Sequence, residues 1–160
     1  MRKIQLTQDK IALVDNSDYQ FLSKYKWRAI RNKKSRTYYA MANIYEDGKR
    51  TTILMHRKIL NVKKGIICDH INGNGLDNRR LNLRVCSFAE NVRNSRKPIN
   101  NTSGYKGVSW DKRRKIWQSY ITYKDKTIHL GAFRDIGVAA FEYNKAAIKY
   151  HKKFANLNFI

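Results

Sequence analysis

Residues 69–94 read DHINGNGLDNRRLNLRVCSFAENVRN, and this segment spaces four polar side chains at short intervals. Asp69 and His70 are adjacent, while Asn82 and Asn91 follow His70 by 12 and 21 positions. Any one of these residues alone is most simply read as a turn, cap or surface residue. Their occurrence together favours a single site with chemistry.

The local sequence predicts how such a site could form. The Gly- and Asn-rich run at 72–78 is too polar for a core element and predicts a loop. Alternation over 83–86 predicts a strand, and Ser87 with Glu90 forms a capping box at the start of a helix over 88–94. A β-loop-β-α unit of this kind can gather the four side chains.

Phosphodiester cleavage needs the groups that this set offers. A histidine near neutral pKa can accept a proton from water, and a hard cation can neutralise the scissile phosphate. Carboxylate and amide oxygens suit Mg²⁺ or Mn²⁺. An asparagine carbonyl can orient an imidazole by accepting from its ring N–H.

The charge of the chain favours a polyanionic partner. The 160 residues include 34 Lys and Arg against 12 Asp and Glu, a formal charge of +22. The basic excess is spread over 1–60, 61–100 and 101–160, so it is not one basic tail, and nucleic acid is the favoured partner. Anionic membrane is second, but no apolar run is long enough to span a bilayer. We expect no signal peptide, membrane contact or small-molecule cofactor, and a monomer in the cytoplasm of a host cell.

The two cysteines do not predict a disulfide framework. Cys68 and Cys86 are expected to be buried thiols in a reducing compartment. A zinc site formed by Cys68, His70 and Cys86 is an alternative, but the paired short spacing typical of zinc ligands is missing.

The sequence before residue 55 is β-rich. Strands are predicted at 3–6, 10–14, 27–31, 37–44 and 51–55, with a helical turn near 18–24, a hairpin turn at Asp47-Gly48 and a short helix at 55–60. Its many aromatic residues are expected to pack in the core and on the sheet.

The last sixty residues predict a separate βββα unit. The polar stretch 95–103, with the only proline, is read as a linker. Strands are expected at 105–110, 116–123 and 127–130, followed by a helix over 136–152 with Asp135 as N-cap. The helix carries a face of small residues suited to packing on a sheet. The overall fold class is therefore α+β.

The segment 55–94 resembles the HNH homing endonucleases of phages, through Met55-His56-Arg57, Asp69-His70-Ile71-Asn72-Gly73-Asn74, Asp77-Asn78-Arg79, Asn82-Leu83-Arg84 and Glu90-Asn91. The resemblance implies a ββα-metal (HNH) nuclease unit with one Mg²⁺ or Mn²⁺ ion. It implies His70 as general base, Asn82 as the residue that orients it, and Asp69 with Asn91 as metal ligands.

Four neighbouring arginines have two possible interpretations. They either line the path of the DNA phosphates or belong to the solvated surface, and they are Arg79, Arg80, Arg84 and Arg93. His56 is either a contact to the site or DNA, or a histidine packed at a helix start. Cys68 is expected to point away from the site, because side chains alternate along a strand.

The segment 104–160 resembles the ethylene-response-factor (Apetala-type) DNA-binding domain of plants, through Tyr105-Lys106-Gly107-Val108, Trp117, Leu130-Gly131-Ala132-Phe133, Ala139-Ala140, Tyr143, Ala146-Ala147 and Ala155-Asn156-Leu157-Asn158-Phe159. The resemblance implies a three-stranded sheet on one helix, with the sheet face in the major groove. Trp117 and Ile121 then point inward. The contact positions carried over are Lys106, Gly107, Ser109, Tyr120, Thr122, Thr127 and His129. Arg113 and Arg114 are expected to grip phosphates, and Trp110 is either a groove contact or a core residue.

The sequence thus predicts a β-rich accessory part at 1–54, the nuclease unit at 55–94, the linker and the DNA-binding domain at 104–160. The expected function is a site-specific, metal-dependent endonuclease that acts on double-stranded DNA as a nickase. The alternatives are a DNA-binding transcription regulator with an inactive nuclease unit, and a protein that binds RNA by stacking.

Overall fold

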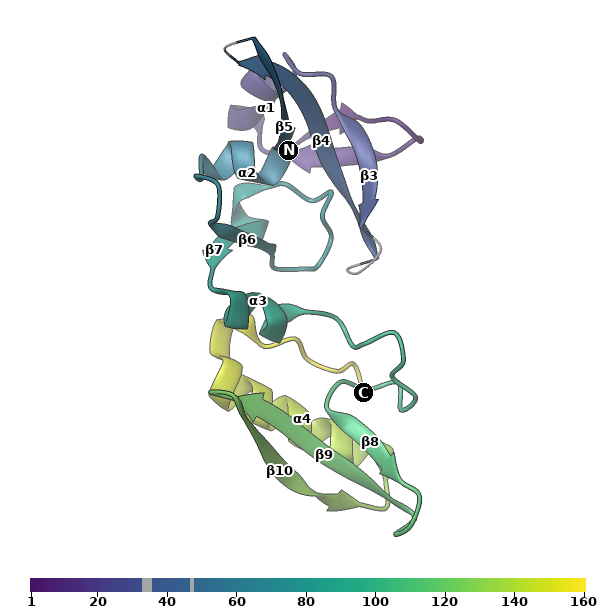
Figure 1. Ribbon diagram of the computed structural model, residues 1–160. Helices are drawn as coiled ribbons and strands as arrows, with labels where there is room; N and C mark the ends of the chain where they lie inside the picture. The colour runs from purple at the N-terminus through teal and green to yellow at the C-terminus, as the bar shows by residue number, and fades with distance from the viewer. Residues whose placement is uncertain (33–35, 47) are drawn as a thin grey trace. The chain divides into compact units, whose positions relative to one another are not determined.

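The computed structural model describes residues 1–32, 36–46 and 48–160 of the chain. It is α+β and divides into two compact units, Met1–Asn91 and Val92–Ile160 (Figure 1). The predicted linker at 95–103 lies within the second unit. Among the described residues, no helix combines the length and the apolar character needed to cross a bilayer.

The N-terminal unit is built from three antiparallel sheets and short helices. Its elements up to residue 60 are β1 (Arg2–Gln5), β2 (Ile11–Val14), α1 (Asn16–Leu22), β3 (Arg28–Asn32), β4 (Thr37–Glu46), β5 (Lys49–Leu54) and α2 (Met55–Leu60). β4 is the central strand between β3 and β5, while β1 pairs with β2. Asp47 of the predicted hairpin turn lies outside the described residues.

A hydrophobic core holds these elements together. Leu22 and Met55 are fully buried, and Trp27 donates its indole N–H to the Leu22 carbonyl over 2.8 Å. The alternation of apolar residues in β2 and β4 places Val14 and Ala40 in the same cluster. Apolar burial of this kind contributes about 25 cal/mol per Å², so the core fixes the platform on which the next hairpin rests.

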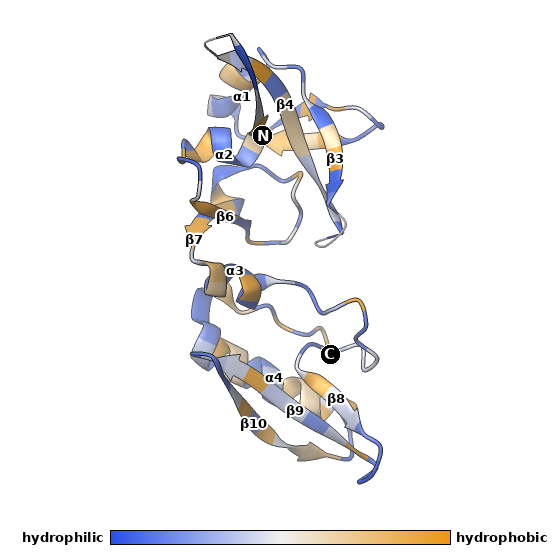
Figure 2. Cartoon of the chain, in the orientation of Figure 1, coloured by the Kyte–Doolittle hydropathy of each residue, from blue (hydrophilic) through white to orange (hydrophobic). Residues whose placement is uncertain are grey.

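The next elements are β6 (Ile67–His70), the 3₁₀ turn Arg80–Asn82, β7 (Leu83–Cys86) and α3 (Phe88–Asn94). The Ser87 N–H donates to Glu90 Oε2 over 2.8 Å and the Glu90 N–H to Ser87 Oγ over 3.3 Å, which confirms the predicted capping box. In Figure 2 the two strands carry hydrophobic colours, whereas much of the loop between them is polar.

The C-terminal unit is a three-stranded antiparallel sheet packed on one helix. It contains β8 (Val108–Asp111), β9 (Ile116–Tyr123), β10 (Lys126–Phe133), α4 (Ile136–His151) and a 3₁₀ turn (Lys152–Phe154), with strand order β10-β9-β8. The predicted N-cap is confirmed, because the Asp135 side chain accepts from the Val138 N–H over 2.8 Å.

Small residues let α4 approach the sheet closely. Ala146 and Ala147 pack with Tyr143 around Ile121 of β9, so the predicted inward direction of Ile121 is confirmed. Gly107, at φ +75°, lies where a Cβ atom would be 2.1 Å from Tyr143 Cδ2. Only glycine leaves room for this contact.

Candidate functional site

The loop between β6 and β7 is tied to the body of the N-terminal unit by its backbone. Leu13 of β2 donates its N–H to the Leu76 carbonyl and accepts from the Asn78 N–H, both over 2.8 Å. The Gly75 N–H donates to Thr37 Oγ1 over 3.0 Å. A Cβ atom on Gly75 would lie 2.4 Å from the Tyr38 carbonyl oxygen, so the glycine allows the loop to reach β4. The loop is therefore held in place despite its polar composition.

Asp69 and Arg84 form a cross-strand ion pair in the hairpin. They are register partners on β6 and β7, and Arg84 donates from Nε and Nη2 to Asp69 Oδ2 over 3.0 and 2.7 Å. Asp69 is buried and the side chain of Arg84 is mostly covered. The strand register thus brings a carboxylate beside His70 and compensates its charge.

His70, the last residue of β6, is buried in a small aromatic cluster. Its ring contacts those of Tyr39 and His56 at centroid distances of 5.6 and 4.9 Å. Its Nε2 donates to Asn78 Oδ1 over 3.2 Å, which makes Nδ1 the acceptor nitrogen of the neutral ring. The side chain that orients the imidazole in this structure is therefore that of Asn78.

Burial keeps both histidines of the cluster neutral. Desolvation lowers the pKa of His70, against an opposing effect of the Asn78 hydrogen bond and of Asp69 and Asp77. Desolvation, followed by the charges of His70 and Arg57, lowers the pKa of His56 to about 3. A neutral imidazole is the form that can accept a proton.

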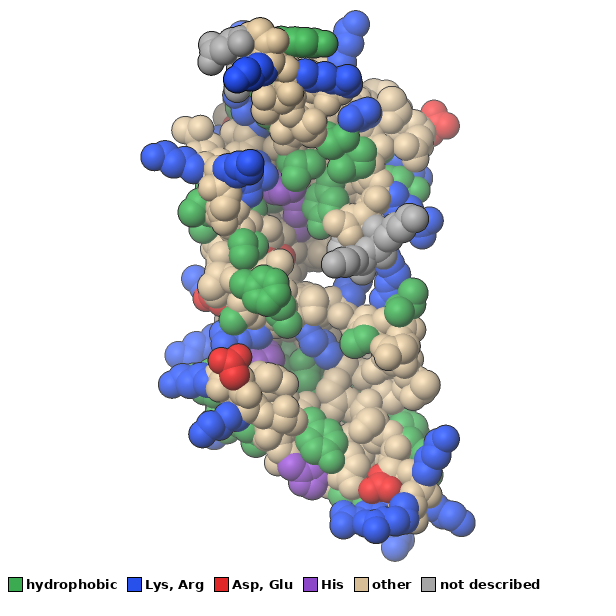
Figure 3. Space-filling model, viewed as in Figure 1, with side chains coloured by type: hydrophobic (Ala, Val, Ile, Leu, Met, Phe, Trp, Pro, Cys, Tyr) green, Lys and Arg blue, Asp and Glu red, His purple; other side chains and the backbone are tan. Residues whose placement is uncertain are grey.

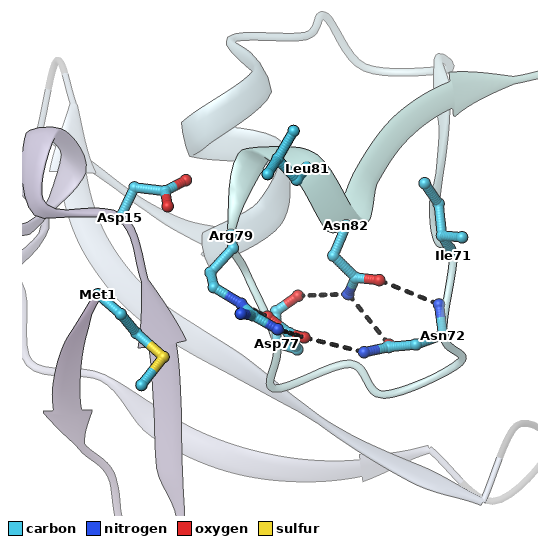
Figure 4. Close-up of a pocket in the computed structure, with 8 residues that line it drawn as sticks. All are labelled: Met1, Asp15, Ile71, Asn72, Asp77, Arg79, Leu81 and Asn82. Carbon is cyan, nitrogen blue, oxygen red and sulfur yellow. Dashed lines mark hydrogen bonds and ion pairs between the residues drawn. The ribbon is translucent and has the colours of Figure 1, made fainter.

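Asn82 organises the loop rather than the imidazole. Its Nδ2 donates to the Asp77 carbonyl over 2.7 Å and to Asn72 Oδ1 over 3.0 Å, and its Oδ1 accepts from the Asn72 N–H over 3.0 Å. Figure 4 shows this network on the wall of a cavity of about 370 Å³ that Ile71 and Leu81 also line. The expected role of Asn82 as the orienting residue stays a prediction, with Asn78 in the direct contact.

Asn91 lies on α3, where its N–H donates to the Ser87 carbonyl over 3.0 Å. Within the described residues, no group of three or more His, Cys, Asp or Glu side chains is placed to hold a metal ion. The alternative zinc set of Cys68, His70 and Cys86 is therefore not assembled. Burial raises the pKa of Cys86 to about 11, which disfavours the thiolate that zinc requires.

Three of the four arginines expected along a phosphate path, Arg79, Arg80 and Arg84, are engaged with acidic partners, and Arg93 lies over the ring of Tyr123. Arg79 donates from Nε and Nη2 to the two oxygens of Asp77, each over 2.7 Å. Arg80 makes the same fork to Asp18 over 2.9 and 2.7 Å. Both guanidinium groups remain about half exposed, so one face of each is open to solvent.

The C-terminal unit has a sheet face that α4 does not cover. Val108, Ile121 and Ile128 point to the helix, and the alternating positions point outward. These outward residues are Ser109, Gln118, Tyr120, Thr122, Thr127 and His129. Figure 3 shows Lys and Arg side chains around the turn between β8 and β9, where Arg113 and Arg114 are exposed.

Three of the expected DNA contacts in this unit lie elsewhere. Lys106 donates from Nζ to the carbonyls of Arg93 and Ser95, both over 2.6 Å, and burial lowers the pKa of Lys106 to about 8. Gly107 packs against α4. Trp110 pairs with Trp117 in register and in a ring contact of 4.8 Å, on the side of the sheet that faces the helix.

Fold and site together define a small α+β protein of two units, one with a β-loop-β-α site and one with a three-stranded sheet on a helix. The chain belongs to the family of protein 3.8 of Escherichia phage T7, to which it is 36% identical over 94 residues, 59% of this chain and 77% of the phage protein.

Two plant proteins are similar to a shorter part of the chain. The AP2-like ethylene-responsive transcription factor TOE2 of Arabidopsis thaliana is 36% identical over 70 residues, and APETALA2-like protein 2 of Oryza sativa subsp. indica is 38% identical over 64. These alignments cover 43% and 40% of this chain but only 14% and 15% of the plant proteins. A scan against protein-family models finds no match.

Proposed function

We propose that the protein binds double-stranded DNA through the outward face of the sheet β8-β9-β10. The observation that carries this proposal is an exposed polar sheet face with a basic turn at one end. Two interstrand spacings give the three strands a breadth of about 10 Å, which suits a major groove about 12 Å wide and not a minor groove of about 6 Å. The plant relatives are named as transcription factors, and their aligned segments are close in length to Val92–Ile160.

The test is duplex binding by fluorescence anisotropy over a range of salt concentrations. Affinity should fall steeply with salt, because each phosphate contact contributes a slope of about 0.9 in log K against log salt. The double variant Arg113→Gln/Arg114→Gln should lower that slope by about 2. Lys149→Gln, on the exposed side of α4, is the matched control and should leave the slope unchanged. Equal slopes for all three proteins would refute the proposed face.

We further propose a second function, divalent-metal-dependent cleavage of the bound DNA by the N-terminal unit, as a site-specific nickase. The observation that favours it is a buried, neutral imidazole with a carboxylate beside it and an asparagine on Nε2. With Nε2 bonded to Asn78, Nδ1 of His70 is the nitrogen that would accept the proton from water. Asn82 would act by holding the loop that carries Asn78.

A carboxylate and an amide oxygen are ligands that a hard cation takes. Asp69 and Asn91 would hold the ion through a carboxylate and an amide oxygen, with water and phosphate oxygens completing its shell. When bound, the ion would neutralise charge on the scissile phosphate and the leaving oxygen. Arg84 would keep the Asp69 side chain positioned through its two hydrogen bonds to Oδ2.

Binding without cleavage, as in a transcription regulator with an inactive nuclease unit, has more support from the plant relatives than cleavage has. A plasmid-nicking assay separates the two. Nicking in Mg²⁺ or Mn²⁺ that stops in EDTA supports the nuclease. If the protein binds the plasmid tightly but leaves it intact in both metals, the result supports the regulator with an inactive nuclease unit.

A further inference from the structure

A row of hydrogen bonds crosses the outward face of the C-terminal sheet. Gln118 of β9 donates from Nε2 to Asp111 Oδ2 on β8 over 3.3 Å. On its other side, Gln118 Oε1 lies 2.6 Å from His129 Nε2 on β10. The ring of Tyr120, the register partner of His129, packs on the imidazole at a centroid distance of 5.0 Å. His129 is exposed, while Gln118 beneath it is buried.

The chemistry of the three groups fixes the direction of this row. Backbone N–H groups of Arg114 and Arg113 and the Gln118 amide lower the pKa of Asp111, which is therefore an ionised carboxylate. An ionised carboxylate only accepts hydrogen bonds, so it must face the amide nitrogen of Gln118. The amide oxygen of Gln118 then faces His129 and can only accept, so Nε2 of His129 carries the proton.

The tautomer also decides what the other ring nitrogen, Nδ1, can do. In a neutral imidazole with its proton on Nε2, Nδ1 is a bare acceptor. A neutral His129 ring thus offers an acceptor, and not a donor, on the outward face of the edge strand β10. In the major groove, the amino groups of adenine and cytosine are the donors that an acceptor can read.

We propose that His129 is a specificity-determining residue whose Nδ1 accepts a hydrogen bond from the amino group of an adenine or cytosine, and that Gln118 and Asp111 are positioning residues that fix its tautomer. This inference rests on the proposed binding of DNA by the sheet. Gln118 and Asp111 then influence base preference without touching DNA.

The first test needs no DNA. Long-range ¹H–¹⁵N NMR of the full chain at neutral pH should show the Nε2–H tautomer for His129 in the wild type. Gln118→Met removes the amide and should give a mixture of the two tautomers. A wild-type imidazole protonated on Nδ1 alone would overturn the inference.

The second test is site selection from randomised duplex DNA, followed by affinity measurements on the selected site. The wild type should prefer adenine or cytosine at one position by about threefold to tenfold, the worth of one net hydrogen bond. His129→Phe keeps a ring against Tyr120 and should lose the preference at that position alone. Gln118→Glu places a carboxylate against Nε2 and favours the imidazolium, whose Nδ1–H donates, so the preference should move to guanine or thymine.

The outcomes separate this inference from the proposed function. Duplex binding with no base preference, or a preference that His129→Phe leaves intact, overturns the role of His129 while DNA binding stands. A wild-type protein that binds no duplex DNA overturns both. Lys149→Gln serves again as the control and should select the wild-type site.

Discussion

The buried His56 predicts a loss of stability in mild acid. An unfolded histidine binds a proton near pH 6.5, whereas folding lowers the pKa of His56 to about 3. The folded state therefore binds fewer protons between these values, and stability present above pH 6.5 is lost as the pH falls toward 3. One pKa unit corresponds to about 1.4 kcal/mol. From His56 alone, the free energy of unfolding of the N-terminal unit should therefore fall by about 2 kcal/mol between neutral pH and pH 5.

The indole N–H of Trp27 offers a probe of that unit, because it is buried and bonded to Leu22. We would follow its NMR signal through urea unfolding at pH 7.5 and 5.0, for the wild type and for His56→Gln. The variant cannot titrate at this position. Its free energy of unfolding should therefore fall by about 2 kcal/mol less than that of the wild type between pH 7.5 and 5.0. If both proteins lose the same stability between the two pH values, His56 is not held neutral by burial and the reasoning fails.

Gly107→Ala should destabilise the C-terminal unit by about 2–4 kcal/mol, from backbone strain and overpacking against Tyr143. Gly104→Ala, also at positive φ but with nothing within 4 Å of the new Cβ, should cost only about 1–2 kcal/mol; equal midpoints in thermal unfolding would contradict this. His70→Ala should lower the single-turnover nicking rate about 100-fold to 10,000-fold on pre-bound DNA, with affinity unchanged; an unaltered rate would move the base elsewhere. Because the pKa of His70 is lowered, the midpoint of the fall in rate toward acid should lie below pH 6.5; a midpoint above 6.5 would refute the buried neutral base.

Features that depend on residues close together in the chain could be predicted from the sequence. The capping box and the N-cap of α4 depend on residues three positions apart, and both form as expected. β10 extends to Phe133, beyond the predicted end at residue 130, because pairing resumes at Gly131 after a register shift. A glycine in a strand pattern signals such an irregularity.

Contacts between residues far apart in the chain could not be predicted from the sequence. Arg80 and Asp18 are 62 positions apart, and only the fold brings them together. The contact of Asn78 with His70 depends on the path of the loop, which β2 fixes through backbone bonds. The DN dipeptide at 77–78 was visible, and an asparagine so close to a candidate base was a signal for a partner. No local pattern around Lys106 indicated that its amine would donate to the carbonyls of Arg93 and Ser95.

The two units have buried clusters made of different residues, centred on Leu22 and Met55 in one and on Tyr143 in the other. A gene fusion or exchange near the codon for Asn91 would therefore leave each core whole, and neither module would need to repack. In a chain built this way, one unit can be replaced without disturbing the buried cluster of the other.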